Sequence, residues 1–109
     1  MALPVAVLHI LVTLADGDSH GYAIMQDVAA RTDGTLRLGP GTLYGSIKRM
    51  LHDGLIEELD DRPAAGRDDA RRRYYRITPR GRKAARAEIA RLEKLVRQAR
   101  ATGLVVKHG

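Results

Sequence analysis

Cysteine, tryptophan and phenylalanine are all absent from this chain of 109 residues. Without cysteine there can be no disulfide, no thiolate nucleophile and no cysteine-based zinc or iron–sulfur site, which fits an intracellular protein. Four tyrosines are the only aromatic side chains, and they are too few for the stacking surfaces that bind single-stranded nucleic acids. The length supports one domain, so we expect one compact function.

Complete catalytic sites are not evident in the sequence. It has no HExxH and no Walker glycine loop. Gly17, Ser19 and Gly21 match GxSxG, but Ser19 and His20 are neighbours in one loop near Asp16, and neighbours in a loop do not make a catalytic triad, so we expect neither an enzyme nor a cofactor. The four histidines are scattered without ligand spacing, and no metal site is predicted; a site shared between two subunits, built from His9 and carboxylates, is the alternative. The apolar run at residues 3–15 is too short to cross a bilayer and has no basic segment before it, which favours a buried helix in a cytoplasmic protein without membrane contact.

Positive charge is concentrated in one part of the chain. Residues 1–61 carry four Lys/Arg against nine Asp/Glu, residues 62–86 carry ten against two, and residues 87–109 carry five against two. The net charge of +6 therefore conceals local charges of −5, +8 and +3. A dense cationic patch attracts a polyanion by releasing condensed counterions, and arginine forks fit phosphate oxygens in pairs. Nucleic acid is the first expected partner.

Hydrophobic spacing predicts three short helices in series. The first covers about residues 4–15 and is apolar nearly all round, so it must be covered on more than one side. The second covers about residues 21–33, with Ser19 as its cap. The third covers about residues 40–53, and its core stripe has the i, i+4, i+7, i+8 spacing of Leu43, Ile47, Met50 and Leu51.

Two strands and a long helix are predicted to follow. Residues 55–59 and 72–77 have β-favouring patterns, and the region between them is rich in turn-forming residues. Thr78 is placed to cap a last helix that begins at Pro79 and ends near Ala101.

This order of elements is the layout of a winged helix-turn-helix, in which the second helix of the pair enters the major groove of duplex DNA. The expected fold class is mainly α with a small β-hairpin. Residues 1–78 are assigned to the winged helix-turn-helix, and residues 79–109 to a C-terminal dimerisation helix and tail within one compact domain.

The third helix is the expected reader of DNA. At about 100° per residue, its outer face is small at the start and basic further along. A glycine within a helix costs about 1 kcal/mol relative to alanine, so Gly41 and Gly45 need a reason. Either DNA approaches closely at these positions, or Gly41 is simply part of the helix start and Gly45 is a tolerated defect. Tyr44 borders the core stripe and has a structural or a DNA-contacting role. The residues expected to contact DNA on this helix are Gly41, Thr42, Tyr44, Lys48 and Arg49.

The hairpin supplies a second group of cations. Arginines beside a flexible turn typically reach phosphates or the minor groove, which positions a protein more than it specifies a sequence. The expected contacts are Arg67, Arg71, Arg72 and Arg73. Asp68 and Asp69 partly neutralise the tip.

Several motifs match one family in their order along the chain. They are His20-Gly21-Tyr22, Pro40-Gly41-Thr42-Leu43-Tyr44, Lys48-Arg49-Met50, Asp53-Gly54-Leu55-Ile56, and Arg73-Tyr74-Tyr75-Arg76-Ile77-Thr78 with Gly81. In these motifs the chain resembles the PadR family of bacterial transcriptional regulators, from residue 5 to about residue 100.

The resemblance implies a homodimeric winged-helix repressor that binds a palindromic operator and releases it when a small effector binds. It places Thr42, Tyr44 and Lys48 on the reader helix, and Tyr22 near the DNA backbone. The chain departs from the family at Gly39, where a capping Ser is frequent, and at Gly45, where Pro is common.

An apolar seam along the last helix predicts a dimer. Its members recur at spacings of four and three, as in a coiled coil, and about 22 residues reach roughly 33 Å, more than a small winged helix covers. The apolar first helix offers matching surface. The expected interface consists of Val5, Leu8, Val12, Ala85, Ile89, Leu92, Val96 and Ala99. The alternative is an ordinary amphipathic helix folded back on its own domain.

A small-molecule effector would bind at the same interface, in a cavity lined by Leu8, Val12, Ile89, Leu92 and Val96. Those residues are more simply read as the dimer core, and no effector is named. Two other functions fit the same arginines or the same fold: a nonspecific nucleic-acid-binding protein, and a winged-helix adapter for protein interactions.

Overall fold

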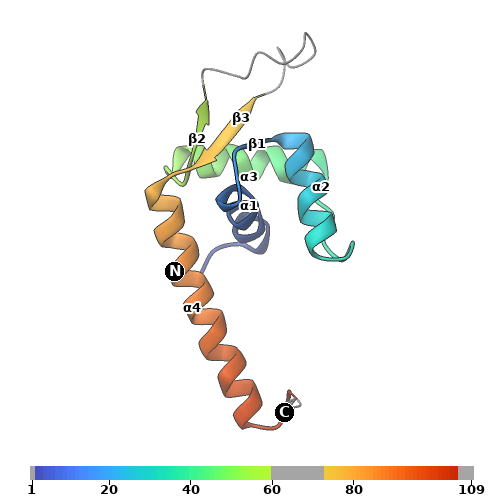
Figure 1. Cartoon of the computed structure of the whole chain (residues 1–109), viewed down its shortest axis with the longest axis vertical. Coiled ribbons are helices and arrows are strands. Elements are labelled where there is room, and N and C mark those ends of the chain that lie inside the picture. Colours follow the sequence, from blue (N-terminus) through green and yellow to red (C-terminus); the bar gives the residue numbers. More distant parts are fainter. Residues whose placement is uncertain (1, 60–72, 106–109) are drawn as a thin grey trace.

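The computed structural model describes residues 2–59 and 73–105. The elements along the chain are α1 (Val5–Ala15), β1 (Ser19–His20), α2 (Gly21–Arg31), α3 (Pro40–His52), β2 (Ile56–Leu59), β3 (Tyr74–Ile77) and α4 (Pro79–Ala101). In Figure 1, α1 lies between α2 and α4, α3 lies behind it, and the strands lie above it. The predicted fold class, mainly α with a small β-hairpin, is confirmed.

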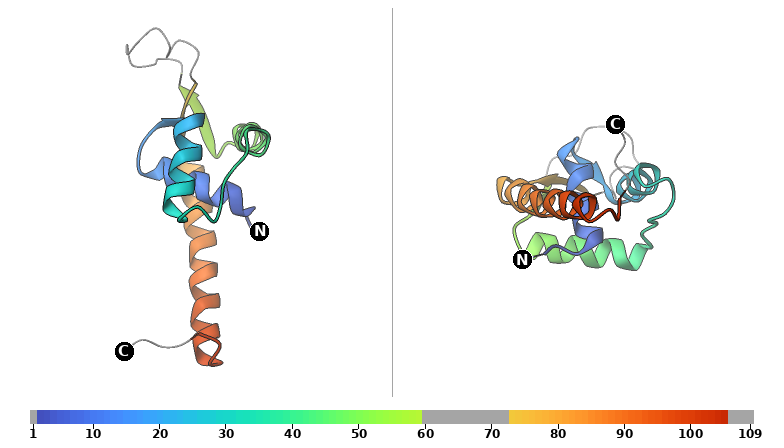
Figure 2. Two further views of the ribbon diagram at one scale, coloured as in Figure 1. Left: turned by 90° about the vertical axis from the view of Figure 1, so that its right-hand side faces the viewer. Right: turned by 90° about the horizontal axis from the view of Figure 1, so that it is seen from below.

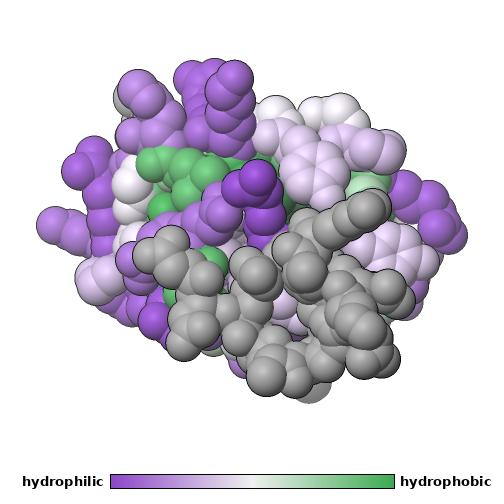
Figure 3. All heavy atoms as spheres, turned by 90° about the horizontal axis from the view of Figure 1, so that it is seen from above, coloured by the Kyte–Doolittle hydropathy of each residue, from purple (hydrophilic) through white to green (hydrophobic). Residues whose placement is uncertain are grey.

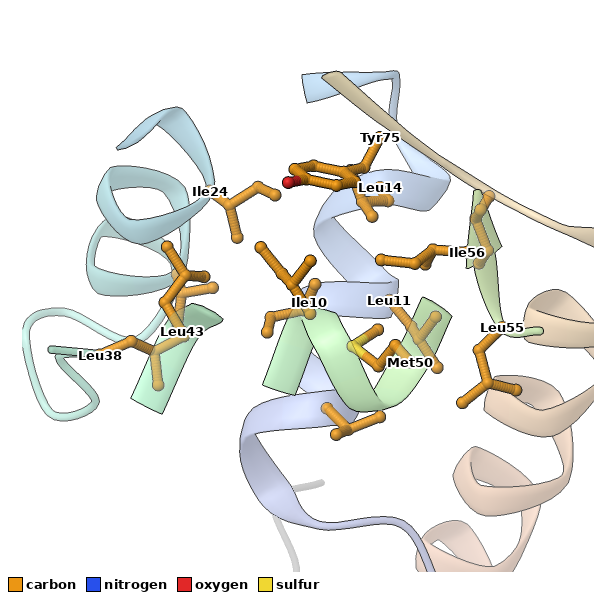
Figure 4. Packing of buried hydrophobic residues seen from close by; sticks show 14 residues of the cluster. Ile10, Leu11, Leu14, Ile24, Leu38, Leu43, Met50, Leu55, Ile56 and Tyr75 are labelled. Atoms are coloured by element: carbon orange, nitrogen blue, oxygen red, sulfur yellow. The ribbon is translucent and has the colours of Figure 1, made fainter. Parts of the chain in front are cut away.

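Helix α1 forms the centre of the core. It contacts α2, α3, α4 and β3, and Ile10, Leu11 and Leu14 are almost fully buried. Figure 4 shows these three residues surrounded by side chains from the other elements, among them Ile24, Leu43, Met50, Ile56 and Tyr75. One side of α1 is not covered, because Val5 and Val12 remain 65% and 37% exposed. A helix without a polar face therefore retains apolar surface outside the core of its own chain.

The sheet has one strand more than the sequence pattern predicts. β3 pairs with β2, with Ile56 opposite Ile77, and on its other edge with the two-residue β1, with Ser19 opposite Tyr75. Arg76 of β3 binds both carboxylate oxygens of Asp18, at 3.3 and 2.9 Å, next to β1. Two residues are too few to show a period-two pattern, so β1 can be recognised only from its pairing.

The cap of α2 differs from the prediction, and the cap of α4 agrees with it. The side chain of His20, not that of Ser19, caps α2, and the backbone N–H of Ala23 donates to Nδ1 of His20 at 3.3 Å. Ser19 is one residue too early, because its place in β1 opposite Tyr75 fixes where the helix starts. At α4, Thr78 accepts a hydrogen bond from the N–H of Gly81 at 3.0 Å, as predicted.

Helix α4 leaves the rest of the chain soon after it begins. Among its residues only Gly81 and Glu88 are buried, and the left view in Figure 2 shows the helix running away from the other elements. Glu88 accepts hydrogen bonds from Nε and Nη2 of Arg91 at 3.0 and 2.6 Å. The guanidinium of Arg91, and then the backbone N–H of Leu3, hold the pKa of the Glu88 carboxyl below its usual value.

Glu88→Gln is expected to make the stability of the protein less sensitive to acid. The native pKa of Glu88 is lowered, so its carboxylate stabilises the fold above the unfolded-state pKa of about 4.3, and this contribution is lost as the pH falls through the native pKa. Urea unfolding at a series of pH values should show a shallower acid-side slope for Glu88→Gln than for the unsubstituted protein. Glu93→Gln, an exposed change on the same helix, is the control; equal slopes for all three proteins would contradict the assignment.

Candidate nucleic-acid interface

The outer face of α3 is exposed in the way that helical spacing predicts. Leu43, Ile47 and Met50 are buried, and Leu51 is half-buried. At about 100° per residue, the residues opposite this core stripe or beside its outer face are all exposed, and so is Tyr44 at the border of the stripe: Gly41, Thr42, Gly45, Lys48, Arg49 and His52. The core stripe therefore fixes which residues of α3 face outward.

The two glycines on this face are not required by the fold. A Cβ atom added at Gly41 or Gly45 would meet no other atom within 4 Å, and both residues lie inside α3, without a positive φ. Gly21 at the start of α2 is different, since a Cβ there would lie 2.5 Å from the hydroxyl oxygen of Tyr44. Folding thus explains Gly21, whereas Gly41 and Gly45 reduce helix stability without any packing benefit.

Tyr44 connects α3 to the start of α2. Its phenol ring lies over Gly21, and the side chain is still 51% exposed. Tyr22, the next residue of α2, is 58% exposed. The structural role predicted for Tyr44 is therefore present, and the residue remains exposed beside the outer face of α3.

The N-terminus of α3 has no side-chain cap. Gly39 occupies the cap position, and no acidic residue lies in the first turn. The first N–H groups of a helix have no partner within it and carry the positive end of its dipole, so an exposed, uncapped start is suited to an anion such as phosphate. The sequence analysis did not include the uncapped start of α3 in the predicted site. Gly39 at the cap position, where the family often has Ser, was the signal that could have identified it.

Positive charge on this face is not neutralised by the residues that the structure describes. Lys48 and Arg49 form no salt bridge with the residues that the structure describes. Arg73, the residue before β3, is exposed and donates from Nη1 to Oε2 of Glu58 at 2.9 Å. Seen from the end that carries the hairpin, hydrophilic side chains surround a small apolar area (Figure 3). The other predicted hairpin contacts, Arg67, Arg71 and Arg72, lie outside the described residues.

The residues predicted for the dimer interface are largely accessible in the single chain. Val5, Val12, Ile89 and Val96 are exposed, and Leu8, Leu92 and Ala99 are half-buried. Ala85 packs against the core of its own chain. Leu95 beside the seam is 54% exposed. Apolar surface therefore remains on α1 and along α4, two helices that contact each other.

A cleft of about 660 Å³ lies between the N-terminal segment, the end of α3 and the first turns of α4. It is lined by Leu3, Asp53, Leu55, Arg80, Lys83, Ala84 and Ala87. None of the five residues predicted to line an effector cavity is among them. The cleft combines an apolar floor with two cationic side chains.

Within the two described ranges, no three His, Asp or Glu side chains cluster as metal ligands would. No helix in that part of the chain is both long enough and apolar enough to span a bilayer.

Comparisons of the sequence with known proteins point to one family. The model of the transcriptional regulator PadR-like family matches residues 10–87. A transcriptional regulator of Mycobacterium tuberculosis is 38% identical over 91 residues, which are 84% of this chain and 78% of the relative.

Solved structures of transcriptional regulators are also similar to this chain. A transcriptional regulator from Clostridium thermocellum is 30% identical with a TM-score of 0.68, over 94% of this chain and 90% of the other. A PadR family transcription regulator from Clostridium difficile has a TM-score of 0.76, over 91% of this chain and 98% of the other; at 22% identity, it supports the fold alone. By the family match and the 38% identical relative, this chain belongs to the PadR family of transcriptional regulators.

Proposed function

We propose that the protein is a sequence-specific DNA-binding repressor, which binds a palindromic operator as a homodimer. One observation carries the proposal: the outer face of α3 combines two glycines that the fold does not require with two cations that no described side chain neutralises. A surface that reduces helix stability and leaves charge unpaired is explained by a partner that approaches closely and is negatively charged.

The proposed mode of binding follows from the order of residues along α3. The free N–H groups at the start of the helix bind a phosphate, and Gly41 and Gly45 let the backbone approach the groove. Lys48 and Arg49 reach base edges or phosphates further along the groove. Tyr22 and Tyr44 contact the DNA backbone beside them, and the hairpin arginines Arg67, Arg71, Arg72 and Arg73 hold the adjacent duplex.

In a homodimer, two copies of the short helix α3 act together in recognition of the operator. We assign residues 79–109 to dimerisation and residues 1–78 to the winged helix-turn-helix. The apolar surfaces of α1 and α4 meet those of a second copy around a two-fold axis, which places two α3 helices about 34 Å apart on successive major grooves. A small effector that separates or rotates the subunits would release the operator, because both readers must fit at once.

Gly45→Ala is expected to stabilise the protein and to weaken DNA binding. Alanine at this exposed helical position should raise the free energy of unfolding by up to about 1 kcal/mol, because it has the higher helix propensity and meets no neighbouring atom. Operator affinity should fall about tenfold, the size of a lost contact, because the methyl group faces the DNA. Urea unfolding and fluorescence anisotropy with an operator duplex measure the two effects.

Lys48→Ala is a second test of the proposed function, and a duplex of scrambled sequence is the control. Lys48→Ala should lose affinity and sequence preference together, whereas a nonspecific binder would show salt dependence without preference for the operator. A protein-interaction adapter would bind neither duplex. Unchanged operator affinity in both Gly45→Ala and Lys48→Ala would contradict the proposed function.

A further inference from the structure

Helix α4 carries far more positive charge than the proposed function uses. Its 23 residues include eight Lys/Arg and two Glu, a net charge of +6. Four of the cations follow one side of the helix, at successive spacings of three, eight and three residues. We call these residues the α4 basic stripe: Lys83, Arg86, Lys94 and Arg97. At about 100° per residue, this stripe lies opposite Gly81 and Glu88, the two buried residues of α4.

The cations of the α4 basic stripe are exposed and unpaired. All four side chains are exposed, and none forms a salt bridge within the described part of the chain. Lys83 with Arg86, and Lys94 with Arg97, are like charges three residues apart, an arrangement that destabilises an isolated helix. Arg82 and Arg100 lie on one flank of the α4 basic stripe, and the carboxylate of Glu93 lies on the same flank. An external anion bound along the stripe would offset this repulsion.

The proposed operator site and the proposed dimer seam both leave this surface free. The seam of Ile89, Leu92 and Val96 is centred about 130° around the helix from the stripe. Figures 1 and 2 show that the distal part of α4, which includes Lys94 and Arg97, leads away from α3 and the strands. A duplex bound at α3 would not reach these side chains.

We propose that the α4 basic stripe binds a second DNA duplex, so that one dimer holds two duplexes at once. From Lys83 to Arg97 the stripe extends about 21 Å, along which one DNA strand presents roughly six phosphates. Arginine forks bind phosphate oxygens in pairs. Ala87 and Ala90 are the residues between the cations, and their small side chains let a rigid duplex approach.

The small residues between the cations of the α4 basic stripe favour DNA over an anionic membrane or an acidic peptide. A membrane-binding helix places bulky apolar side chains next to its cations, and a peptide-binding groove needs apolar pockets for anchor residues. The α4 basic stripe has neither, because only alanines lie within it. Its interaction with DNA is with the backbone, independent of sequence, and it goes beyond the operator recognition assigned to α3.

A bead assay tests this proposal on the full-length protein. A biotinylated duplex is immobilised, protein is added at low salt, and capture of a second, fluorescent duplex of unrelated sequence is measured. Arg86→Gln/Arg97→Gln is expected to reduce this capture about tenfold or more, while retention of the protein on the immobilised operator changes less than about twofold. Arg31→Gln/Arg37→Gln removes the same charge from exposed positions on α2 and the segment after it, and should capture the second duplex normally.

Several outcomes would overturn the proposal. These are capture by Arg86→Gln/Arg97→Gln at the unsubstituted level, an equal loss in the Arg31→Gln/Arg37→Gln control, and no capture by the unsubstituted protein. Binding of polyglutamate or phosphatidylglycerol vesicles without capture of a second duplex would assign the stripe to another partner and would also overturn it.

One more variant separates this proposal from the proposed function. Lys48→Ala/Arg49→Ala should lose operator preference but retain salt-sensitive binding of any duplex through the α4 basic stripe. Loss of all duplex binding in Lys48→Ala/Arg49→Ala would refute the second site alone. Retention of full operator preference in the same variant would refute the role of α3 alone.

Discussion

Gly81→Ala is expected to lower the free energy of unfolding by about 3 kcal/mol, the upper end of the cost of overpacking. A Cβ atom at this position would overlap the carbonyl oxygen of Leu55 and would lie 3.0 Å from Cγ1 of Ile77. The carbonyl cannot move aside easily, because it also accepts a hydrogen bond from the N–H of Thr78 at 3.1 Å. Thr78 in turn caps α4 and donates to the carbonyl of Gly54 at 2.6 Å.

The gain in helix propensity opposes this loss and is smaller. Alanine is favoured over glycine in a helix by about 1 kcal/mol, which the exposed control Gly45→Ala shows without the overlap. Urea unfolding followed by circular dichroism should therefore move the two midpoints in opposite directions. A midpoint for Gly81→Ala at or above that of the unsubstituted protein would show that α4 can shift away from Leu55 without cost.

The contrast between these two glycines shows what can be predicted from the sequence. Local patterns predicted the core stripe of α3, the cap at Thr78 and the bounds of α4, because each depends on residues within a few positions of one another. The identity of the α2 cap depends on a strand pairing between residues 19–20 and residues 74–75, more than fifty positions apart. The need for glycine at position 81 likewise depends on Leu55, and such long-range contacts have no local signal.

The candidate site divides in the same way. Exposure of Lys48 and Arg49 follows from the period of one helix, and the structure confirms it. The closeness of Tyr44 to the start of α2 could not be predicted, because it depends on how α2 and α3 pack. The dimer interface stays a prediction, since it depends on a second copy of the chain. What the structure adds is that apolar side chains on α1 and α4 remain outside the core of the single chain.

Leu92→Glu is expected to convert the proposed dimer into a folded monomer and to reduce operator affinity by about 10²- to 10⁴-fold, because a monomer engages one half-site at a time. Leu92 lies on the seam between the exposed Ile89 and Val96, and a carboxylate buried there without a partner would strongly disfavour association. Leu92 is not among the residues that form the core of the single chain, so the far-ultraviolet circular dichroism spectrum should be retained. Multi-angle light scattering gives the mass.

Gln98→Glu is the matched control, because it adds the same charge to an exposed position of α4 outside the seam, and it should leave both mass and operator affinity unchanged. The comparison distinguishes dimerisation from a general effect of negative charge near DNA, which both variants would share. A Leu92→Glu protein that remains dimeric would place the subunit contact elsewhere on the chain. A monomeric Leu92→Glu with full operator affinity would instead show that one α3 helix is sufficient, and that the two-fold arrangement does not contribute to recognition.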